Sequence, residues 1–404
     1  MVVKTQIPLL KDHHTHPFMY AVLSRCIDLK SVSNKQEALS LIKSGNDEIN
    51  VILGWNNSLY LFEQRELEQL PAVVICNTSL HRFLINRAAR EKLGASHQEI
   101  LAHLDEMHWV EKNLPKILNL IASIKSYHPE QIERFYHALL QQGVWYAEEL
   151  LLPNEGVIHL FKEQGYFERT RFWADMETFH SLSREAQRDV YGIKIFTDGA
   201  LGSETAALDA PYLTTGKKGP LVYSDEELYA IIRQVVEINK AVALHAIGDS
   251  ATAQIVTVLS LIKDEQGTIP PTRIEHCQFI SQREAQNAKS LGITLSMQPN
   301  FSWDSVQYRD RLSEKDQTQN NPFRMLIDEI GFVPGQDLVF GSDGMPHGVQ
   351  NALESALFPP FPRSQALTLD EFVGGYCMPD KTHGYIEVTI DEDKRRVLTT
   401  VQGV

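Results

Sequence analysis

The stretch VALHAIGD, residues 242–249, is a short apolar run of β type with a histidine, His245, near its end. Four other stretches also place a residue of metal-ligand type at or just past the end of such a run. They are KDHHTH at residues 11–16, GIKIFTDGA at 192–200, RIEHCQF at 273–279 and VFGSDG at 339–344. A (β/α)8 barrel collects its active site at the carboxyl ends of its strands. The order and placement of these residues therefore favour a barrel with a metal site.

Short apolar runs of strand type alternate along the chain with amphipathic, helix-like stretches. The strand-like runs are residues 7–10, 143–149, 170–176, 192–196, 241–247, 273–279, 293–299 and 338–343. This βαβ rhythm is typical of a parallel sheet, and eight such strands close a barrel. The 404 residues suffice for one barrel of roughly 250 residues with insertions. The predicted fold class is α/β, a (β/α)8 TIM barrel.

The predicted division of the chain follows from one interruption of this rhythm. Residues 1–31 are expected to hold the first barrel strand, and residues 136–376 the remainder of the barrel. Residues 32–135, with strand-like runs at 50–55 and 72–77 and then a polar helical region, are expected to form an insertion at the barrel mouth. Loops at that face usually carry specificity. A separate small domain is the alternative.

The tail, residues 377–404, reads as two alternating strands around a charged turn at 391–393, which predicts a hairpin. A two-stranded hairpin is marginal alone, so we expect it to pack on the body or on another subunit. A homodimer is therefore one expectation.

Composition limits the classes of partner. The net charge of −14 argues against nucleic acid, because binding to phosphates needs a basic face. The four cysteines lie far apart and form no CxxC pair, which predicts reduced thiols and a cytoplasmic protein. We find no signal peptide, and no apolar run approaches the roughly 18–20 residues of a membrane span. A small-molecule substrate is the expected partner.

His14 and His16 are two residues apart, so on a strand both imidazoles point to the same side. At a strand end they form a chelating pair, although this polar tract also fits a surface histidine cluster. Lys194 stands between Ile193 and Ile195, where a charged ammonium loses its hydration. It is either a lysine that snorkels to solvent or one with a lowered pKa that adds CO₂.

His245 and His276 end consecutive strand-like runs. A single histidine there is usually a core residue, but two of them downstream of a His-x-His pair favour metal ligands. Asp343 follows Phe340 at the end of the last run, where a carboxylate can bind metal and also accept a proton. The simpler interpretation of Asp343 is an ordinary turn residue.

Several motifs together resemble the amidohydrolase superfamily, and more narrowly the YtcJ-like branch of the amidohydrolase-3 family. They are KIFTDGALGSETAALDAPY at residues 194–212, HAIGDSA at 245–251, RIEHCQ at 273–278, SMQPNF at 296–301 and GSDGMP at 341–346. Weaker similarities are GWNN at Trp55 and HRFLINRAA from His81. The resemblance implies that Trp55, His81 and Asn86 contact substrate from the insertion.

The resemblance also implies a (β/α)8 barrel with two divalent metal ions, usually zinc. In that pattern one ion is held by His14, His16 and Asp343. His245 and His276 hold the other, and Lys194, carboxylated by CO₂ to a carbamate, bridges them.

Three features depart from the family pattern. Only about eleven residues precede Asp12 and the tail is short, so the flanking β-sandwich of relatives is expected to be absent or reduced. Glu204 stands where an arginine is common, which reverses the local charge. The usual GxxxPGKxADxxxL ending is replaced by GYIEVTIDEDKRR at residues 384–396.

The predicted function is a metal-dependent hydrolase that cleaves a C–N bond of an amide, a cyclic amide or a related group, other than a peptide bond. A metal-bridging hydroxide attacks, and Asp343 serves as general base and then acid. One alternative is a mononuclear deaminase-type barrel, with His276 catalytic and Lys194 only structural. Another is a non-catalytic binding or scaffold protein that kept the barrel. The sequence contains neither a GxSxG elbow nor a glycine-rich phosphate loop, so it does not indicate a serine nucleophile or a phosphate-binding barrel.

Overall fold

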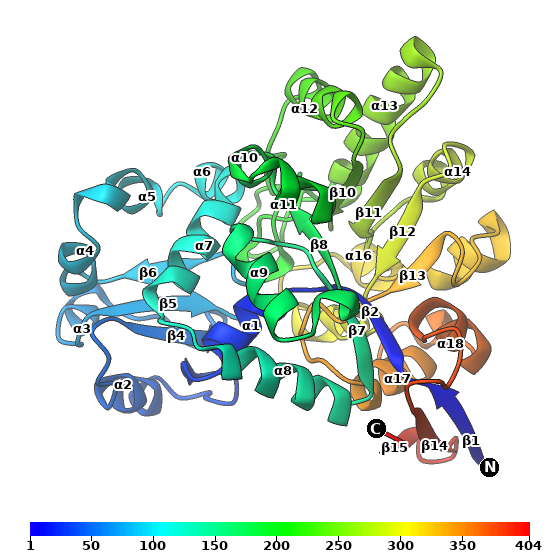
Figure 1. Ribbon diagram of the computed structural model, residues 1–404, viewed down its shortest axis with the longest axis horizontal. Coiled ribbons are helices and arrows are strands. Elements are labelled where there is room, and N and C mark those ends of the chain that lie inside the picture. Colours follow the sequence, from blue (N-terminus) through cyan, green and yellow to red (C-terminus); the bar gives the residue numbers. More distant parts are fainter.

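Figure 1 shows the computed structural model, which describes all 404 residues. Eight parallel strands form one sheet in the order β2-β7-β8-β9-β10-β11-β12-β13. Their bounds are Leu10–Thr15, Val144–Glu149, Thr170–Ala174, Val190–Phe196, Ala241–Ala246, Thr272–His276, Thr294–Met297 and Leu338–Phe340. The two ends of this order meet, because Asp343 N donates to His14 O over 2.6 Å just after β13. The predicted TIM barrel is confirmed.

The first barrel strand lies later in the chain than the run expected at residues 7–10. Barrel pairing starts at Leu10, whose N donates to Gly143 O over 2.7 Å. The preceding residues form a separate strand, β1, at Val2–Pro8. Pro8 has no N–H to donate to a ladder, which suits the end of one strand and the change of sheet.

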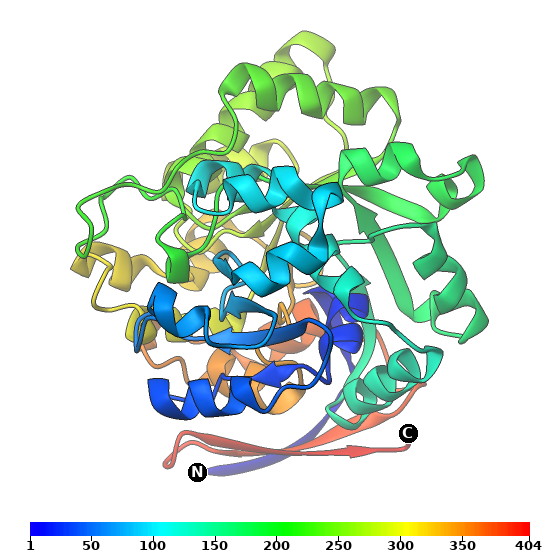
Figure 2. The same cartoon turned by 90° about the vertical axis from the view of Figure 1, so that its left-hand side faces the viewer.

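β1 belongs to a three-stranded antiparallel sheet of order β1-β14-β15, with β14 at Tyr385–Asp391 and β15 at Arg396–Gln402. Both chain ends lie along this sheet, below the barrel in Figure 2. Ile386 and Val388 of β14 are buried, whereas Glu387 between them is exposed. A small three-stranded sheet thus stands beside the barrel. The hairpin packs on the body of the same chain, where Val397 N donates to Glu354 Oε2.

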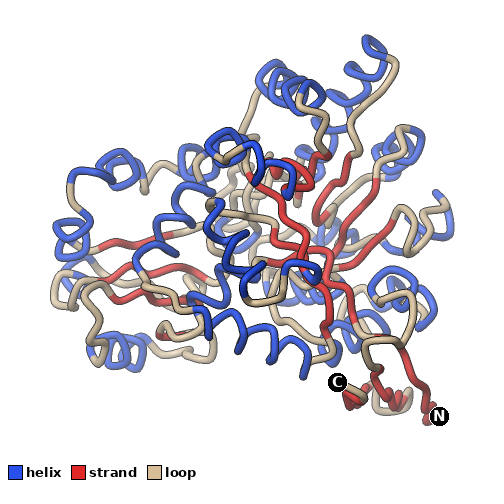
Figure 3. Tube along the Cα trace, in the orientation of Figure 1, coloured by secondary structure: helices blue, strands red, loops and turns tan.

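Helices surround the barrel strands on the outside (Figure 3). They are α1 (Pro17–Leu23), α8 (Pro129–Gln141), α9 (Glu155–Glu163), α10 (Met176–Ser181), α11 (Arg184–Asp189), α12 (Asp225–Glu237), α13 (Asp249–Gln266), α14 (Gln282–Ser290), α17 (Val349–Leu357) and α18 (Leu369–Tyr376). Two short helices, α15 (Asp304–Gln307) and α16 (Glu314–Gln319), belong to the connection between β12 and β13. A π-helical turn occupies Met325–Ile330. Ser224 caps α12 by accepting a hydrogen bond from Glu227 N in a capping box.

The insertion after β2 carries its own sheet, of order β3-β4-β5-β6, and lies to one side of the barrel in Figure 1. The strands are Ile27–Asp28, Asn50–Trp55, Val73–Asn77 and Phe83–Ile85. The helices are α2 (Lys35–Lys43), α3 (Gln64–Leu67), α4 (Arg87–Leu93), α5 (Gln98–His103), α6 (Met107–Lys112) and α7 (Leu114–Ile124). A small apolar core that includes Leu29, Ile52 and Ile75 holds this sheet to its helices.

The border expected between residues 135 and 136 falls inside α8. That helix packs on α1 of the barrel, where Gln131 Nε2 donates to Ala21 O and Val22 O. No helix of the chain combines the length and the apolar character needed to cross a membrane.

Candidate metal centre and active site

His14, His16 and Asp343 converge at the carboxyl end of the barrel. Their ligand atoms all lie within 4.8 Å of one another. Asp343 Oδ1 is 3.5 Å from His16 Nε2 and 3.8 Å from His14 Nε2. Asp343 has a positive φ of 54°, and Tyr20 OH donates to its carbonyl oxygen over 2.7 Å. The loop after β13 is thus held in a strained conformation that turns the carboxylate toward the two imidazoles.

His245 and His276, at the ends of β10 and β11, complete a row of rings with His14. The ring centroids of His14 and His276 are 4.6 Å apart, and those of His276 and His245 are 4.4 Å apart. Adjacent parallel strands end at the same edge of the barrel, which explains why residues so distant in sequence meet. The structure brings all five predicted imidazole and carboxylate ligands together.

Lys194 lies in β9, beside the row of histidines, and is almost fully buried. Its Nζ atom has no hydrogen-bond partner. Burial lowers the pKa of Lys194 to about 8, although the charges of Glu275 and Asp343 oppose the shift. An unpartnered buried amine is costly in a folded protein, so this position calls for a ligand or a modification.

The three histidines in the row are neutral in this environment. Burial lowers the pKa of His14, His245 and His276 well below the ordinary value, and the positive charge of Lys194 adds to the shift. The Nδ1 atoms of His16 and His276 are buried without partners. Neutral imidazoles with free nitrogen atoms are the form that binds a metal ion, so the residues fit a metal centre.

Two small adjoining cavities, of about 50 and 40 Å³, open onto these residues. Both are lined by His81, His245, His276 and Asp343. A larger cavity of about 330 Å³ lies between the insertion and residues 202–218, and His81 lines it too. The site is therefore a narrow inner chamber that adjoins a wider outer one.

Comparison with known families identifies the chain. The sequence profile of the amidohydrolase family matches residues 4–354. The chain belongs to the amidohydrolase family. The family expected from the motifs at residues 194–212 and 245–251 is thereby confirmed.

Two relatives match a part of this amidohydrolase. The Bacillus subtilis (strain 168) protein YtcJ is 36% identical over 110 residues, which are 27% of this chain and 20% of YtcJ. The Arabidopsis thaliana protein LONG AFTER FAR-RED 3 is 32% identical over 117 residues, which are 28% of this chain and 20% of that protein. Each match spans about a fifth of the relative's own length.

Solved structures share the fold of this amidohydrolase. An uncharacterized metal-dependent hydrolase from Pyrococcus horikoshii OT3 superposes with a TM-score of 0.68 at 21% identity, covering 92% of this chain and 80% of the other. One from Pyrococcus furiosus gives a TM-score of 0.65 at 20% identity with the same coverage. At this level of identity the likeness concerns the fold alone.

The three residues of the insertion that we expected to contact substrate have different surroundings. His81 lines all of the cavities described above, with Nδ1 2.6 Å from Glu111 Oε2. Trp55 is buried in the core of the insertion and donates from Nε1 to Tyr60 O over 3.0 Å. Asn86 caps α4 by accepting from Ala89 N over 3.0 Å. Trp55 and Asn86 line none of these cavities, and their contacts hold the insertion together.

A buried carboxylate that the sequence motifs did not indicate supports one of the candidate ligands, His14. Glu275 Oε2 accepts from His14 Nδ1 over 2.6 Å and also pairs with Arg273. Arg273 in turn donates to Glu148 Oε2 over 2.9 Å. Glu275 stands inside the run RIEH, where a charged residue in a buried strand is an unusual choice. The presence of a charged residue in a strand of buried type was the sequence feature that could have indicated a role for Glu275.

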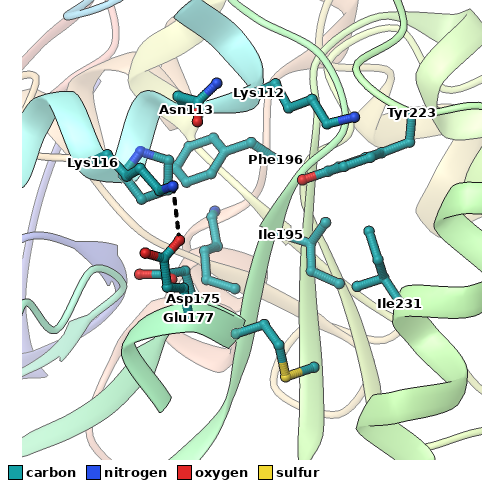
Figure 4. Close-up of a pocket in the computed structure, with 12 residues that line it drawn as sticks. Lys112, Asn113, Lys116, Asp175, Glu177, Ile195, Phe196, Tyr223 and Ile231 are labelled. Atoms are coloured by element: carbon teal, nitrogen blue, oxygen red, sulfur yellow. Dashed lines mark ion pairs between the residues drawn. The ribbon is translucent and has the colours of Figure 1, made fainter. Parts of the chain in front are cut away.

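A further cavity, of about 200 Å³, reaches Lys194 between the insertion and the barrel. Figure 4 shows Lys112, Asn113 and Lys116 on one side of it, opposite Asp175 and Glu177. Lys116 Nζ pairs with Glu177 Oε2 over 3.0 Å, the dashed line in Figure 4. Lys112 pairs with Glu227 over 2.9 Å. Both Lys112 and Lys116 therefore have an acidic partner.

Proposed function

We propose that this amidohydrolase is a metal-dependent hydrolase that cleaves a carbon–nitrogen bond of an amide, a cyclic amide or a related group, other than a peptide bond. The convergence of His14, His16 and Asp343, with ligand atoms within 4.8 Å of one another, carries the proposal. Imidazole and carboxylate are the ligands that zinc uses in catalytic sites. The match to the amidohydrolase family over residues 4–354 supports it.

The proposed centre holds two divalent cations, with zinc the expected metal. We assign His14, His16 and Asp343 to one cation, and His245 and His276 to the other. When bound, such cations lower the pKa of a water molecule and polarise the carbonyl group of a substrate. The substrate is a small molecule, in keeping with the narrow inner chamber. The cytoplasmic location and the homodimer stay predictions.

Lys194 is the proposed bridge between the cations. Its pKa of about 8 leaves part of the amine unprotonated near neutral pH. The neutral amine adds CO₂ and releases one proton, which gives a carbamate with two oxygen atoms. Those two oxygens can serve two cations, whereas an amine serves one at most. The unpartnered Nζ supports this assignment.

Replacing Lys194 with alanine tests the bridge. We expect the Lys194→Ala variant to lose most of its bound metal, because the shared ligand is gone. Formate or acetate should partly restore it by filling the space with a carboxylate. The measurement is the metal content by plasma mass spectrometry, with and without these acids. Unchanged metal content in the variant rules out the bridging role.

Asp343 is the proposed proton carrier: it accepts a proton from the attacking water and delivers it to the leaving nitrogen. Burial raises the pKa of Asp343, although His16 and Lys194 oppose the shift. A raised pKa suits a carboxylate that takes up a proton and gives it away again. Its side chain is also 18% exposed, so it remains in reach of a bound substrate.

The test is a hydrolysis screen of the zinc-loaded protein against amides, lactams, formamides and esters. We expect Asp343→Asn to lower kcat by roughly 100-fold or more while metal stays bound, as removal of a general base does. Asp328→Asn is the control, because Asp328 is an exposed partner of Arg324 away from the site. Full turnover by metal-loaded Asp343→Asn would falsify the assigned role.

One observation favours a mononuclear centre as the second candidate. Only His14, His16 and Asp343 form a group of three candidate ligand residues whose ligand atoms lie within 4.8 Å of one another. A deaminase-type barrel of this kind binds about one metal per chain, whereas the binuclear centre binds about two. The same metal analysis separates the two. Absence of turnover across the screen by the fully loaded protein favours a non-catalytic binding or scaffold role instead.

A further inference from the structure

Glu111, on α6 of the insertion, is a buried carboxylate with a single partner. It is 1% exposed, and its Oε2 accepts from His81 Nδ1 over 2.6 Å. Its Oε1 has no hydrogen-bond partner. Burying a carboxylate costs free energy unless hydrogen bonds compensate it. The buried Glu111 carboxylate therefore has only one hydrogen-bond partner to compensate its burial, and that partner is His81 of the candidate active site.

The barrel leaves room for this carboxylate. A Cβ atom at Gly199 would lie 2.0 Å from Thr205 Oγ1 and 2.4 Å from Glu111 Oε1, so Glu111 lies directly against this glycine. The carbonyl oxygen of the same glycine accepts from His245 Nε2 over 3.1 Å. Glu111 therefore packs directly on the loop that touches one of the metal-ligand histidines. The Glu111 side chain thus forms part of the contact between the insertion and the barrel.

His81 occupies the junction of the chambers. It is the one residue that lines both inner cavities and the outer cavity of about 330 Å³. Glu111 holds Nδ1, and no protein group pairs with Nε2. A substrate that reaches from the metal ligands into the outer chamber must pass this ring. Nε2 is then the nitrogen available to it.

We infer that Glu111 is a positioning residue that fixes the His81 ring at this junction, so that Nε2 makes a hydrogen bond to the substrate next to the bond that is cleaved. The inference rests on the proposed function, because it needs a substrate at the metal centre. In free solution an imidazole exchanges its proton between both nitrogens and rotates. A buried carboxylate at Nδ1 stops both motions and makes one orientation permanent.

The structure supplies a matched control on the same insertion. His103 Nδ1 lies 2.7 Å from Glu106 Oε1, the same kind of pair, but both side chains are substantially exposed. We would compare Glu111→Leu, Glu111→Gln and His81→Gln with the control Glu106→Leu. The Gln variant keeps an oxygen that accepts from Nδ1, whereas the Leu variant removes the acceptor. All variants would be loaded with zinc, and their metal content checked first.

The kinetic readout uses 4-nitrophenyl acetate and the best amide from the hydrolysis screen. We expect Glu111→Leu to lower kcat/KM roughly 10- to 100-fold, as misplaced catalytic contacts do, with unchanged metal content. Glu111→Gln should recover most of this loss, and Glu106→Leu should match the wild type. In the His81→Gln background, Glu111→Leu should have no further effect, since its action runs through His81. Wild-type activity in Glu111→Leu, or a further loss in that background, overturns the inference.

A second measurement separates this inference from the proposed function. The ¹⁵N shifts of the His81 ring, assigned by difference from His81→Gln, report which nitrogen carries the proton. We expect a protonated Nδ1 in the wild type and a mixture of tautomers in Glu111→Leu. If no compound of the screen is turned over, the proposed function fails, while identical ¹⁵N shifts in both proteins overturn the inference on its own.

Discussion

At the scale of single residues, the ligands of the candidate centre depend on groups behind them. Glu275 is fully buried and holds Nδ1 of His14, which leaves Nε2 on the side of Asp343. Burial opposes ionisation of Glu275, but Arg273 and Lys194 outweigh it and lower its pKa. An ionised carboxylate at Nδ1 fixes the ring and makes the other nitrogen a better ligand. His14 thus owes its orientation to a residue of another strand.

Replacing Glu275 with glutamine should weaken metal binding. The amide still fills the space, but it lacks the charge that makes the imidazole of His14 a stronger ligand. We expect zinc affinity to fall about 10- to 100-fold, the usual effect of losing such a partner. Competition with a chromophoric chelator measures it. Glu284→Gln is the control, since Glu284 is also mostly buried but pairs with Arg283 on α14; equal affinities in the two variants would contradict the idea.

That the candidate imidazole and carboxylate ligands lie close together could be predicted from the sequence, because each is a polar residue at the end of an apolar run. Strand ends are a local feature, and parallel strands bring them to one edge. The partnerships of Glu275 and Glu111 are not local, since His14 and Glu275 are 261 positions apart. The substrate contact of Trp55 stays a prediction. Its burial in the core of the insertion depends on tertiary packing that the motif at residue 55 does not reveal.

At the scale of elements, the small sheet is held by the alternation of β14. Ile386 and Val388 face the body and are almost fully buried, whereas Glu387 faces solvent. The backbone of β15 adds polar contacts to α17, where Val397 N donates to Glu354 Oε2 over 3.2 Å. The hairpin of the tail was predictable from this alternation. Its third strand was not, because β1 pairs Val2 with Asp391 from the far end of the chain.

A substitution pair within β14 tests which face carries the stability. Ile386→Ala should lower the free energy of unfolding by about 2–5 kcal/mol, because it removes buried methyl groups and leaves a cavity. Glu387→Ala, one residue on and exposed, should change it by no more than about 0.5 kcal/mol. Urea unfolding followed by circular dichroism provides both values. Similar losses in the two variants would show that the sheet does not pack on the body as described.

At the scale of the whole molecule, a buried guanidinium is one of the groups that connect the insertion to the barrel. Arg311 is 4% exposed and donates to Gly202 O over 3.1 Å and to Leu201 O over 3.4 Å. It also donates to the hydroxyl of Ser58 in the insertion. Gly202 lines both the inner and the outer chamber. The wall that the insertion and the barrel share is therefore held by a residue that touches no metal ligand.

Removing this guanidinium should loosen the wall without changing the metal centre. Arg311→Ala removes the hydrogen bonds that Leu201 O, Gly202 O and the Ser58 hydroxyl accept from the guanidinium. Hydrogen bonds to a charged group contribute about 1.5–3 kcal/mol each. We expect faster amide hydrogen exchange in residues 56–58 and 201–203, and a higher KM with unchanged metal content. Exchange followed by mass spectrometry, together with steady-state kinetics, measures both. Arg309→Ala serves as the control, because Arg309 is exposed two residues away. If both variants exchange at the wild-type rate, Arg311 does not connect the insertion to the barrel in solution.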